Sequence, residues 1–512
     1  MKKYLIVTLL FGLGLIINSC YEDLVNNPAE NKPPKTSLFL FPDSSISQQP
    51  SKLRVSWWGD DPDGLIVGFY FTWDGANWTF TTKNDSLFAL QIGATDTVYD
   101  FKVAAVDDGG NGQYDSEIIR NGINFGPEPF IDSNGDGIYN PGEKFYDIGL
   151  VDPNPASLKF PIKNSSPVIV WNDLSVLPDT SFPAMTFGWE AEDLDGDESI
   201  LKINIALNDT SDPSKVISLQ GNVRRITVRT REFTSSNPKM DILIDGSDAS
   251  IFSQKLEGLK FDDFNKFYVQ AEDISGAKSK FIQLPDTTKK WFVKKPSGRL
   301  LIVNDYLASG NPKTFYKNQF DSVSNGSIRG KFDFWDLHVQ KPPYQTITFL
   351  ETIKLFDFVF WYSDNNPSLN LANVATNKFI SGGGAIAFSF WPGISLEAST
   401  LQGFLPIDSV SNFVTGLNFP SNSRIISDST LPEYPNLQTS QGVFLIRGYY
   451  PNPLSASPIY YALSGDPKGY LGFIDSRKKL FFMGIPLHYA NGGQRKVNEL
   501  LTKIFFQDFG LN

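Results

Sequence analysis

The sequence predicts a multidomain protein in which two antiparallel β-sandwiches precede an open α/β domain. In the front half, a tryptophan, an Asp-x-Asp-Gly turn and a later alternating strand occur twice in the same order. After about residue 297, continuous apolar runs alternate with helical stretches, as buried parallel strands and their helices do. The chain has 512 residues, and a soft prior of roughly 150 residues per domain also gives about three domains.

The N-terminal segment MKKYLIVTLLFGLGLIINSC has two lysines, an apolar run and a terminal Cys20. This order is typical of a secretory signal, and the apolar run is shorter than the about 20 residues of a spanning helix. The segment resembles the lipobox of bacterial lipoproteins. That resemblance implies cleavage before Cys20 and acylation of its thiol, so that lipid chains anchor the protein in a membrane. An ordinary signal peptide or an uncleaved helix is the alternative.

The residues after Cys20 bear on the location. In many Gram-negative lipoproteins, an aspartate directly after the cysteine acts as an inner-membrane retention signal. This chain has Tyr21 at that position, so we expect an outer-membrane lipoprotein of the cell envelope. Glu22 and Asp23 also look like the surface-export signal of Bacteroidetes lipoproteins, which leaves both a periplasmic and a surface-facing body open. Residues 24–36 are rich in Pro and Asn without periodicity, which predicts a tether.

The composition excludes some classes of protein. Cys20 is the only cysteine, so disulfides within the chain are impossible and folded cores must supply the stability. The net charge is −11. Because nucleic acids and anionic lipids attract basic surfaces, this balance argues against both as partners.

The repeat in the front half predicts the two sandwiches. Its two matched patterns are Trp57-x3-Asp61-x-Asp63-Gly64 with Trp189-x3-Asp193-x-Asp195-Gly196, and Phe101-x-Val103-x-Ala105-x-Asp107 with Phe267-x-Val269-x-Ala271-x-Asp273. Alternating aromatic and β-branched residues predict strands, and Asp-Gly predicts the tight turns between them. The pattern resembles fibronectin type III and related Ig-like modules. The second copy is longer, with extra residues expected near 210–250.

A loop between the two copies predicts a calcium site. Residues 132–143 read DSNGDGIYNPGE and match D-x-[DN]-x-[DN]-G-x5-E at every position. Calcium takes six to eight oxygen ligands, and this spacing gathers them around a sharp turn at Gly137. The expected ligands are Asp132, Asn134, Asp136, Ile138 through its carbonyl, Asn140 and Glu143.

The loop resembles EF-hand and dockerin calcium loops. Pro127, Pro129 and Pro141 disfavour flanking helices, so we expect a structural ion that stiffens the junction, with a Kd on the order of 10⁻⁴ to 10⁻³ M. A turn without metal is the alternative. Asp193, Asp195 and Asp197 form a candidate second metal site, for which the alternative is turn residues that cap their own backbone.

The C-terminal strands resemble those of the class I glutamine amidotransferase-like fold, in the order LFDFVFWYSDNNP, ISGGGAIAFSF and KKLFFMGIPLHY. That family carries a catalytic cysteine after the strand matched by residues 384–389, and a histidine with a glutamate two residues on. In this chain the segment after that strand, which begins Ser389-Phe390, contains no cysteine. His488 occupies the histidine position, and Ala490 replaces the glutamate. We therefore expect an amidotransferase-like or flavodoxin-like α/β domain without amidotransferase activity.

Other chemistry finds little support in the C-terminal sequence. The large neighbours of Ser389 do not suit a nucleophile elbow, and the glycines at 382–384 precede a strand, which indicates a helix end rather than a phosphate loop. Ligands of open α/β sheets bind at the carboxyl ends of the strands. The residues expected there as a candidate ligand cleft are Asp364, Trp391, His488 and Tyr489. The aromatic rings among them could stack on sugars; packing in the core or at its rim is the alternative.

The sequence thus predicts a non-catalytic cell-envelope lipoprotein that binds a glycan or an envelope protein, with calcium as its cofactor. Two alternatives stay open: an exported hydrolase that uses unrecognised carboxylates of the α/β domain, and a structural spacer. The predicted segments are a signal peptide at 1–19, a lipidated tether at 20–34, sandwich 1 at 35–125, a calcium-loop linker at 126–162, sandwich 2 at 163–292 and the α/β domain at 297–512.

Overall fold

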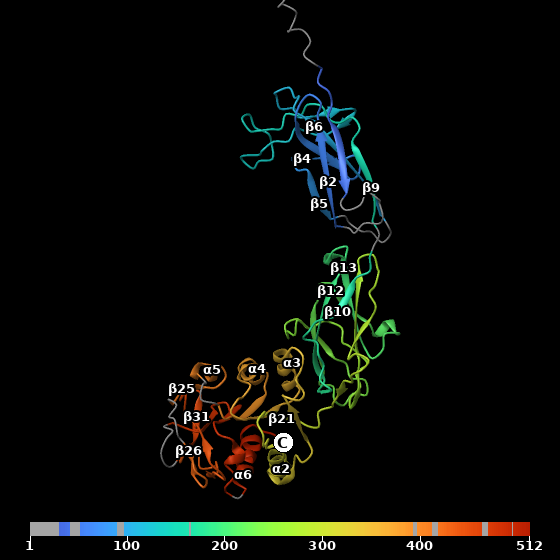
Figure 1. Ribbon diagram of the computed structural model, residues 1–512. Coiled ribbons are helices and arrows are strands. Elements are labelled where there is room, and N and C mark those ends of the chain that lie inside the picture. Colours follow the sequence, from blue (N-terminus) through green and yellow to red (C-terminus); the bar gives the residue numbers. More distant parts are fainter. Residues whose placement is uncertain are drawn as a thin grey trace, which may run out of the picture. The chain divides into compact units, whose positions relative to one another are not determined.

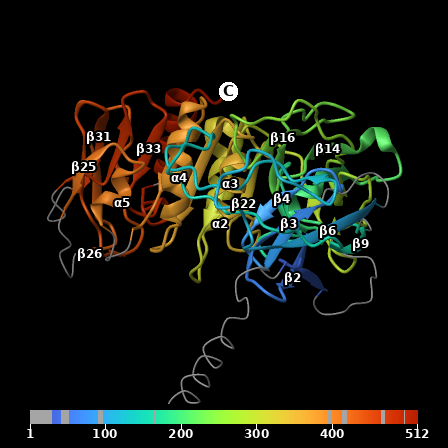
Figure 2. The ribbon, with the colours of Figure 1, turned by 90° about the horizontal axis from the view of Figure 1, so that it is seen from above.

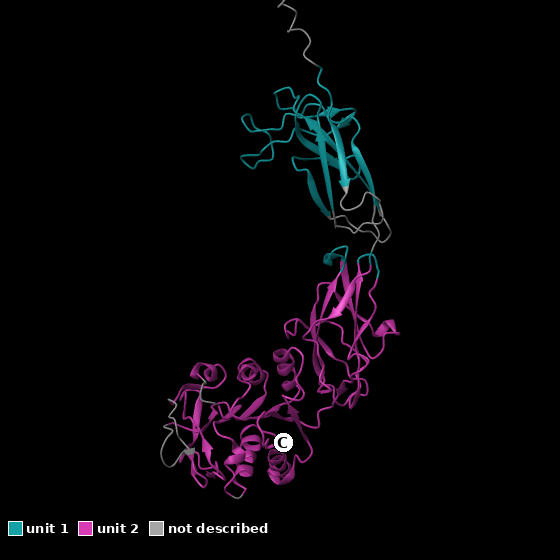
Figure 3. Ribbon diagram, viewed as in Figure 1, with its two compact units in different colours: residues 1–165, 193–199, 274–277 teal, residues 166–192, 200–273, 278–512 magenta. Residues whose placement is uncertain are grey.

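The computed structural model describes residues 30–40, 52–89, 97–162, 165–392, 397–411, 418–462, 469–493 and 495–512. The chain forms two compact units, coloured separately in Figure 3. Unit 1 holds residues 1–165 and the two turns at 193–199 and 274–277, and unit 2 holds the rest of the chain.

Unit 1 contains a β-sandwich of two antiparallel sheets. The sheet orders are β1-β2-β5 and β4-β3-β6-β9. Trp57, the tryptophan of the first repeat, is buried between the sheets and contacts the rings of Phe69 and Phe101. The strands are β1 (Lys35–Leu40), β2 (Lys52–Asp60), β3 (Ile66–Thr72), β4 (Thr79–Thr81), β5 (Asp85–Ala89), β6 (Thr97–Asp107) and β9 (Ala156–Ile162).

A long insert lies between β6 and β9 and contains the predicted calcium loop. It includes the hairpin β7 (Ile119–Arg120) and β8 (Ile123–Asn124). Apolar residues of the insert, such as Ile118 and Ile148, pack with Tyr70 and Val106 of the sheet in a cluster separate from the sandwich core. Strand β9 pairs with β6 along its whole length and buries Phe160. The structure therefore differs from the predicted boundaries, because residues 126–162 belong to the first sandwich rather than to a linker after it.

The second sandwich opens unit 2 and is built around Trp189, which is fully buried and donates from Nε1 to the carbonyl of Val223. Its sheets are β10-β12-β15-β16 and β14-β13-β18-β19, with a small sheet β11-β20-β17 beside them. The strands are β10 (Val168–Trp171), β11 (Thr180–Ser181), β12 (Ala184–Glu192), β13 (Ile200–Leu207), β14 (Ile217–Gln220), β15 (Arg225–Arg229), β16 (Asp241–Ile244), β17 (Asp263–Phe264), β18 (Phe267–Asp273), β19 (Ile282–Leu284) and β20 (Phe292–Val293).

The rest of unit 2 contains a nine-stranded sheet in the order β22-β21-β23-β24-β33-β32-β31-β27-β28 (Figure 1). The first five strands are parallel, and the last four add antiparallel pairs at one edge. They are β21 (Leu300–Asp305), β22 (Phe332–Asp336), β23 (Phe358–Ser363), β24 (Ala385–Ser389), β27 (Arg424–Ser427), β28 (Leu437–Gln438), β31 (Ala456–Ala462), β32 (Gly472–Asp475) and β33 (Leu480–Met483). Two short pairs join β25 (Ile407–Val410) to β30 (Tyr449–Pro451) and β26 (Asn418–Phe419) to β29 (Val443–Phe444).

Helices cover both faces of this sheet, because successive strand residues point to opposite sides. Leu300 and Ile302 share a core with α2 and α6, whereas Leu301 and Val303 share one with α3, α4 and α5. Helix α3 also contacts β12 of the second sandwich, and Figures 1 and 2 both place it between the sheet and that sandwich. The helices are α2 (Lys313–Ser322), α3 (Gln345–Ile353), α4 (Leu369–Ser381), α5 (Ala398–Gln402) and α6 (Lys496–Thr502), which continues as a π-helical turn at Lys503–Asp508.

Candidate functional site

The predicted ligand-cleft residues follow the carboxyl ends of parallel strands. Asp364 follows β23, Trp391 lies two residues beyond β24, and His488 and Tyr489 lie in a short 3-10 helix, Leu487–Tyr489, after β33. The rings of His488 and Tyr489 are 4.3 Å apart at their centroids, and Trp391 and Tyr489 are 6.2 Å apart. Tyr489 thus lies in ring contact with both His488 and Trp391, so the structure links three of the four predicted residues.

Asp364 holds the loop after β21 instead of facing a ligand. Its Oδ2 accepts hydrogen bonds from the backbone N–H groups of Leu307 and Ala308, at 2.8 and 2.7 Å, and its Oδ1 accepts one from Asn366. The carboxylate is buried. These three bonds satisfy both oxygens, so Asp364 acts as a cap for two loops.

Ser389 and His488 both contact the hydroxyl of Tyr316, which lies 3.4 Å from Ser389 Oγ and 3.3 Å from His488 Nδ1. Ser389 is fully buried, donates to the carbonyl of Ile485 and accepts from the N–H of Leu487. Burial lowers the pKa of His488 to about 4, so its ring is neutral at pH 7. A serine without access to solvent does not suit nucleophilic attack on a substrate.

A neighbouring polar network at this edge was not predicted from the sequence. The carboxylate of Asp305, at the end of β21, is fully buried and accepts from the backbone and hydroxyl of Ser368 and from Trp361 Nε1. His338 Nε2 lies 3.1 Å from Asp305 Oδ1. Burial raises the pKa of Asp305, although the hydrogen bonds from Ser368 and Trp361 oppose the shift.

The calcium-loop residues contact the loop's own backbone. Asp132 accepts from the N–H groups of Gly135 and Gly137, at 2.6 and 2.8 Å, and Glu143 accepts from Ser133 and Asn140. Further bonds run from the N–H of Ile138 and the side-chain amides of Asn134 and Asn140 to Asp136, from the N–H of Asp136 to Asn134 Oδ1, and from the Asn140 amide to the carbonyl of Ile138.

These donors would suit a hard cation, because Asp132, Asn134, Asp136, Asn140 and Glu143 supply side-chain oxygens and Ile138 a carbonyl. Within the described ranges, however, no three His, Cys, Asp or Glu side chains gather as a group that could hold a metal ion. Calcium at this loop therefore stays a prediction.

The candidate second metal site also consists of turn hydrogen bonds. Asp193 Oδ1 accepts from the N–H of Asp195, and Asp197 Oδ1 accepts from the N–H of Asp193. Ser165 donates from its backbone and hydroxyl to Asp195. The turn is thus capped partly by its own backbone and partly by Ser165, and metal binding here stays a prediction as well.

Cys20 and the rest of the predicted signal peptide lie outside the described residues. No helix within the described ranges combines the length and the apolar character that crossing a bilayer requires.

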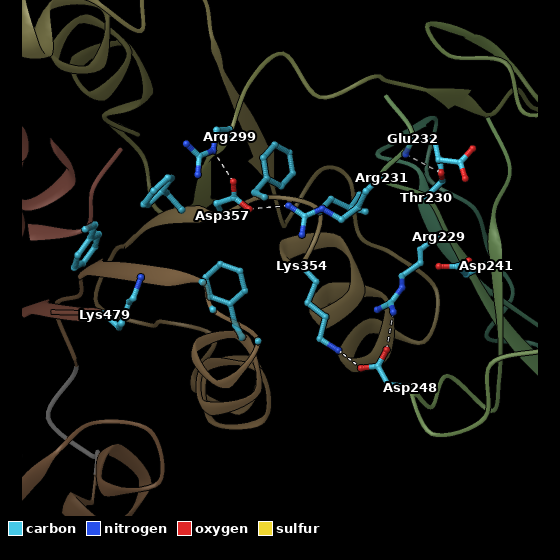
Figure 4. A pocket seen from close by; sticks show the side chains of 18 of the residues that line it. Arg229, Thr230, Arg231, Glu232, Asp241, Asp248, Arg299, Lys354, Asp357 and Lys479 are labelled. Carbon is cyan, nitrogen blue, oxygen red and sulfur yellow. Dashed lines mark hydrogen bonds and ion pairs between the residues drawn. The ribbon is translucent and has the colours of Figure 1, made fainter. Parts of the chain in front are cut away.

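A charged pocket lies at the opposite, amino-terminal edge of the parallel sheet, where the sheet meets the second sandwich (Figure 4). Its volume is about 730 Å³. Arg299, Asp357 and Lys479 line it and stand directly before β21, β23 and β33. The lining includes seven Lys and Arg residues and four Asp and Glu residues. The cations are Arg229, Arg231, Lys239 and Lys255 of the sandwich and Arg299, Lys354 and Lys479 of the α/β domain.

Ion pairs in this pocket cross from the sandwich to the α/β domain. Asp357 accepts from Arg231 Nη2 at 2.7 Å and from Arg299 Nε at 2.6 Å. Burial alone would raise the pKa of Asp357, but the bonds from these two guanidinium groups hold it below its ordinary value. Figure 4 shows Asp357 between the two arginines.

A second group of pairs lies on the sandwich side of the pocket. Arg229 pairs with Asp248 at 2.8 Å and with the buried carboxylate of Glu351, and Lys354 pairs with the same two acids. Two cations thus meet two carboxylates, so this end of the pocket is electrically balanced.

No protein-family model matches the chain, and no curated protein matches it. Solved structures that it resembles include the CbhA fibronectin(III)-like modules of Clostridium thermocellum, at 12% identity and a TM-score of 0.16, covering 51% of this chain and 94% of that one. A two-domain fibronectin type III segment of chicken tenascin has 10% identity and a TM-score of 0.20, with 49% and 96% covered. The chicken CNTN1 FN1–FN3 domains have 12% identity and a TM-score of 0.15, with 46% and 60% covered. At these TM-scores the likenesses carry no argument, and the two sandwiches rest on the strand pairing described above.

Proposed function

We propose that the protein is a lipid-anchored component of the bacterial cell envelope that binds a glycan or an envelope protein without catalysing a reaction. Acylated Cys20 would hold it to the outer membrane. The calcium loop would stiffen the insert of the first sandwich, and unit 2 would carry the ligand site.

The observation that carries the non-catalytic part of this proposal is the environment of Ser389. At the strand end where an amidotransferase-like domain would hold its nucleophile, Ser389 is buried and bound to the backbone at Ile485 and Leu487. The alternative of a hydrolase would need carboxylates that face a cleft. At this edge Asp305 and Asp364 are both buried and engaged in several hydrogen bonds, which favours a structural role for each.

Two experiments test the proposal. Labelling of cells with radioactive palmitate should mark the wild-type chain but not a Cys20→Ser variant, which should leave the membrane fraction. A labelled Cys20→Ser chain would contradict lipidation at that residue.

Binding is tested with purified mature chain, immobilised and exposed in parallel to a glycan array and to defined envelope proteins. The proposal expects saturable binding to at least one of these classes in the presence of calcium. Absence of saturable binding to both classes would favour the structural spacer.

A further inference from the structure

The pocket between the second sandwich and the α/β domain has properties that the carboxyl edge lacks. It is large, with a volume of about 730 Å³, which falls in the usual range of ligand pockets. Most of its cations are paired: Arg229 and Lys354 with Asp248 and Glu351, Lys239 with Glu257, and Lys255 with Asp241 and Glu232. The positive charge that these pairs leave unbalanced lies at Arg231, Arg299 and Lys479.

We infer that this pocket binds a glycan through a carboxylate group of the sugar, held by Arg231, Arg299 and Lys479. The inference rests on the proposed binding function and names its site and its ligand class.

Arg231 and Arg299 have guanidinium N–H groups that do not bind Asp357. Asp357 engages Nε of Arg299 and Nη2 of Arg231, so the other guanidinium N–H groups are available to an incoming anion. The two arginine side chains are 55% and 56% exposed. Arginine presents a planar set of donors that matches a carboxylate. One carboxylate between two arginines leaves a net positive charge there.

Lys479 is a third cation of the pocket lining. It stands directly before β33, which β24 separates from β23 in the sheet, and it has no ion-pair partner among the residues that the structure describes. Its side chain is half-buried. A lysine in this position adds a point charge that a bound carboxylate can neutralise.

The apolar part of the lining is closely packed. The guanidinium of Arg299 lies over the ring of Phe358, 5.2 Å from its centroid, and Phe379 lines the same pocket, but the two phenylalanines are only 4% and 2% exposed. The backbone of Gly382, Gly383 and Gly384 forms part of the lining without side chains. The exposed cations therefore support the carboxylate part of the ligand, and the sugar part follows from the proposed glycan-binding function.

The overall charge of the chain limits the kind of anion. A densely charged polymer would meet repulsion from the acidic surface outside the pocket. A short acidic oligosaccharide carries only a few charges and can place one carboxylate at the pocket, so it is expected to meet less of this repulsion than a long polyanion.

Calorimetric titration of the mature full chain with tetragalacturonate tests the inference. Neutral galactotetraose of the same length and inorganic sulfate are titrated at matched ionic strength. The expected result is binding of tetragalacturonate that weakens as salt is raised, with much weaker binding of the other two.

Three variants locate the site. Lys479→Gln should weaken tetragalacturonate binding by roughly tenfold, because a charge-assisted contact is lost. Asp357→Asn should strengthen it, because the competing carboxylate loses its charge. Lys317→Gln changes an exposed lysine of α2 that is not part of the pocket lining and should leave affinity unchanged. Thermal melting of each variant checks that it is folded.

The outcomes separate this inference from the function on which it rests. Tetragalacturonate binding that Lys479→Gln and Asp357→Asn leave unchanged would overturn the pocket as the site but keep a glycan-binding function. Equal affinity for galactotetraose or for sulfate would overturn the carboxylate-bearing sugar as the ligand. Absence of binding to all three probes would overturn the inference. Of the proposed function, binding of an acidic glycan would then be excluded, whereas binding of an envelope protein would still be tested by the experiment above.

Discussion

Tyr139 stacks face to face on Tyr114, with 3.7 Å between the ring centroids and 9° between the ring planes. Tyr139 is the eighth residue of the predicted calcium loop, and Tyr114 comes from the start of the same insert. Phe130 and Phe145 meet both rings edge-on and pair with each other across the base of the loop. The ring of Tyr139 therefore packs the calcium loop against three aromatic side chains of the surrounding insert.

Removal of the Tyr139 ring should loosen the loop. Tyr139→Ala loses the stack and two edge contacts, so unit 1 should lose at least about 1 kcal/mol of stability. Limited proteolysis should cut faster within residues 126–150, and urea denaturation measures the loss. Tyr139→Phe keeps the ring and serves as the control. Equal protease resistance of Tyr139→Ala and wild type would show that the stack does not hold the loop.

Calcium should bind at residues 132–143 with a Kd on the order of 10⁻⁴ to 10⁻³ M. Titration of chelator-treated protein with calcium measures it, and proteolysis within 126–150 should slow as the site fills. Glu143→Gln removes one of the predicted ligand charges and should weaken binding by tenfold or more, roughly the cost of a lost charged contact. Glu117→Gln changes an exposed carboxylate of the same insert and should have no effect. Equal proteolysis with calcium and with chelator would contradict a stiffening role.

His488 should make unit 2 less stable in acid. Burial lowers the pKa of His488 to about 4 from its ordinary 6.5, so the unfolded chain takes up a proton near pH 6.5 and the folded chain only near pH 4. Stability from this residue is complete above pH 6.5 and falls, by up to roughly 3 kcal/mol, as the pH drops from 6.5 to 4.

Urea denaturation of wild type and His488→Gln at pH 7, 5.5 and 4 measures this effect. The difference in free energy of unfolding between the two proteins should shrink as the pH falls, since only the wild type carries the histidine. A difference that is constant across this range would contradict a buried, neutral His488.

A buried ion pair lies at the end of the C-terminal helix. Lys503 Nζ lies 2.6 Å from Asp508 Oδ1 within the π-helical turn, and the hydroxyl of Tyr434 donates to Asp508 Oδ2. Because Asp508→Ala leaves the charge of Lys503 buried without this partner, the variant should lose about 3–5 kcal/mol in the free energy of unfolding.

The exposed pair of Lys317 and Asp321 provides the matched control. Asp321→Ala removes a carboxylate from the surface of α2 and should cost at most about 1 kcal/mol. If both variants lost the same small amount of stability, the C-terminal pair would not be a structural requirement.

The buried parallel strands could be located from the sequence because they are continuous apolar runs. Phe358–Ser363, Ala385–Ser389 and Leu480–Met483 lie within the segments LFDFVFWYSDNNP, ISGGGAIAFSF and KKLFFMGIPLHY named from the sequence, and Leu300–Asp305 is a further apolar run after residue 297. Strand Phe332–Asp336 was missed, since its sequence FDFWD is interrupted by aspartates. Strand Ala156–Ile162 was assigned to a linker, because a long insert separates it from the strand with which it pairs.

The charged pocket could have been predicted in part from charged residues that precede the buried strands. Arg299, Asp357 and Lys479 each precede a buried strand, and the amino ends of parallel strands meet at one edge of a sheet. The contribution of Arg229 and Arg231 could not be predicted, because it depends on how the second sandwich packs against α3. The roles of Asp364 and Ser389 were also hidden, since each depends on loop backbone that folds back onto the strand end.

Unit 2 is proposed to bind its ligand without changing it. The most direct test incubates the mature protein with tetragalacturonate and follows, in one sample, the bound fraction by calorimetry and the mass of the recovered oligosaccharide by mass spectrometry. The expected result is saturable binding with every oligosaccharide recovered at its original mass. Shorter products that accumulate with time, and that are absent when heat-denatured protein is used, would contradict it.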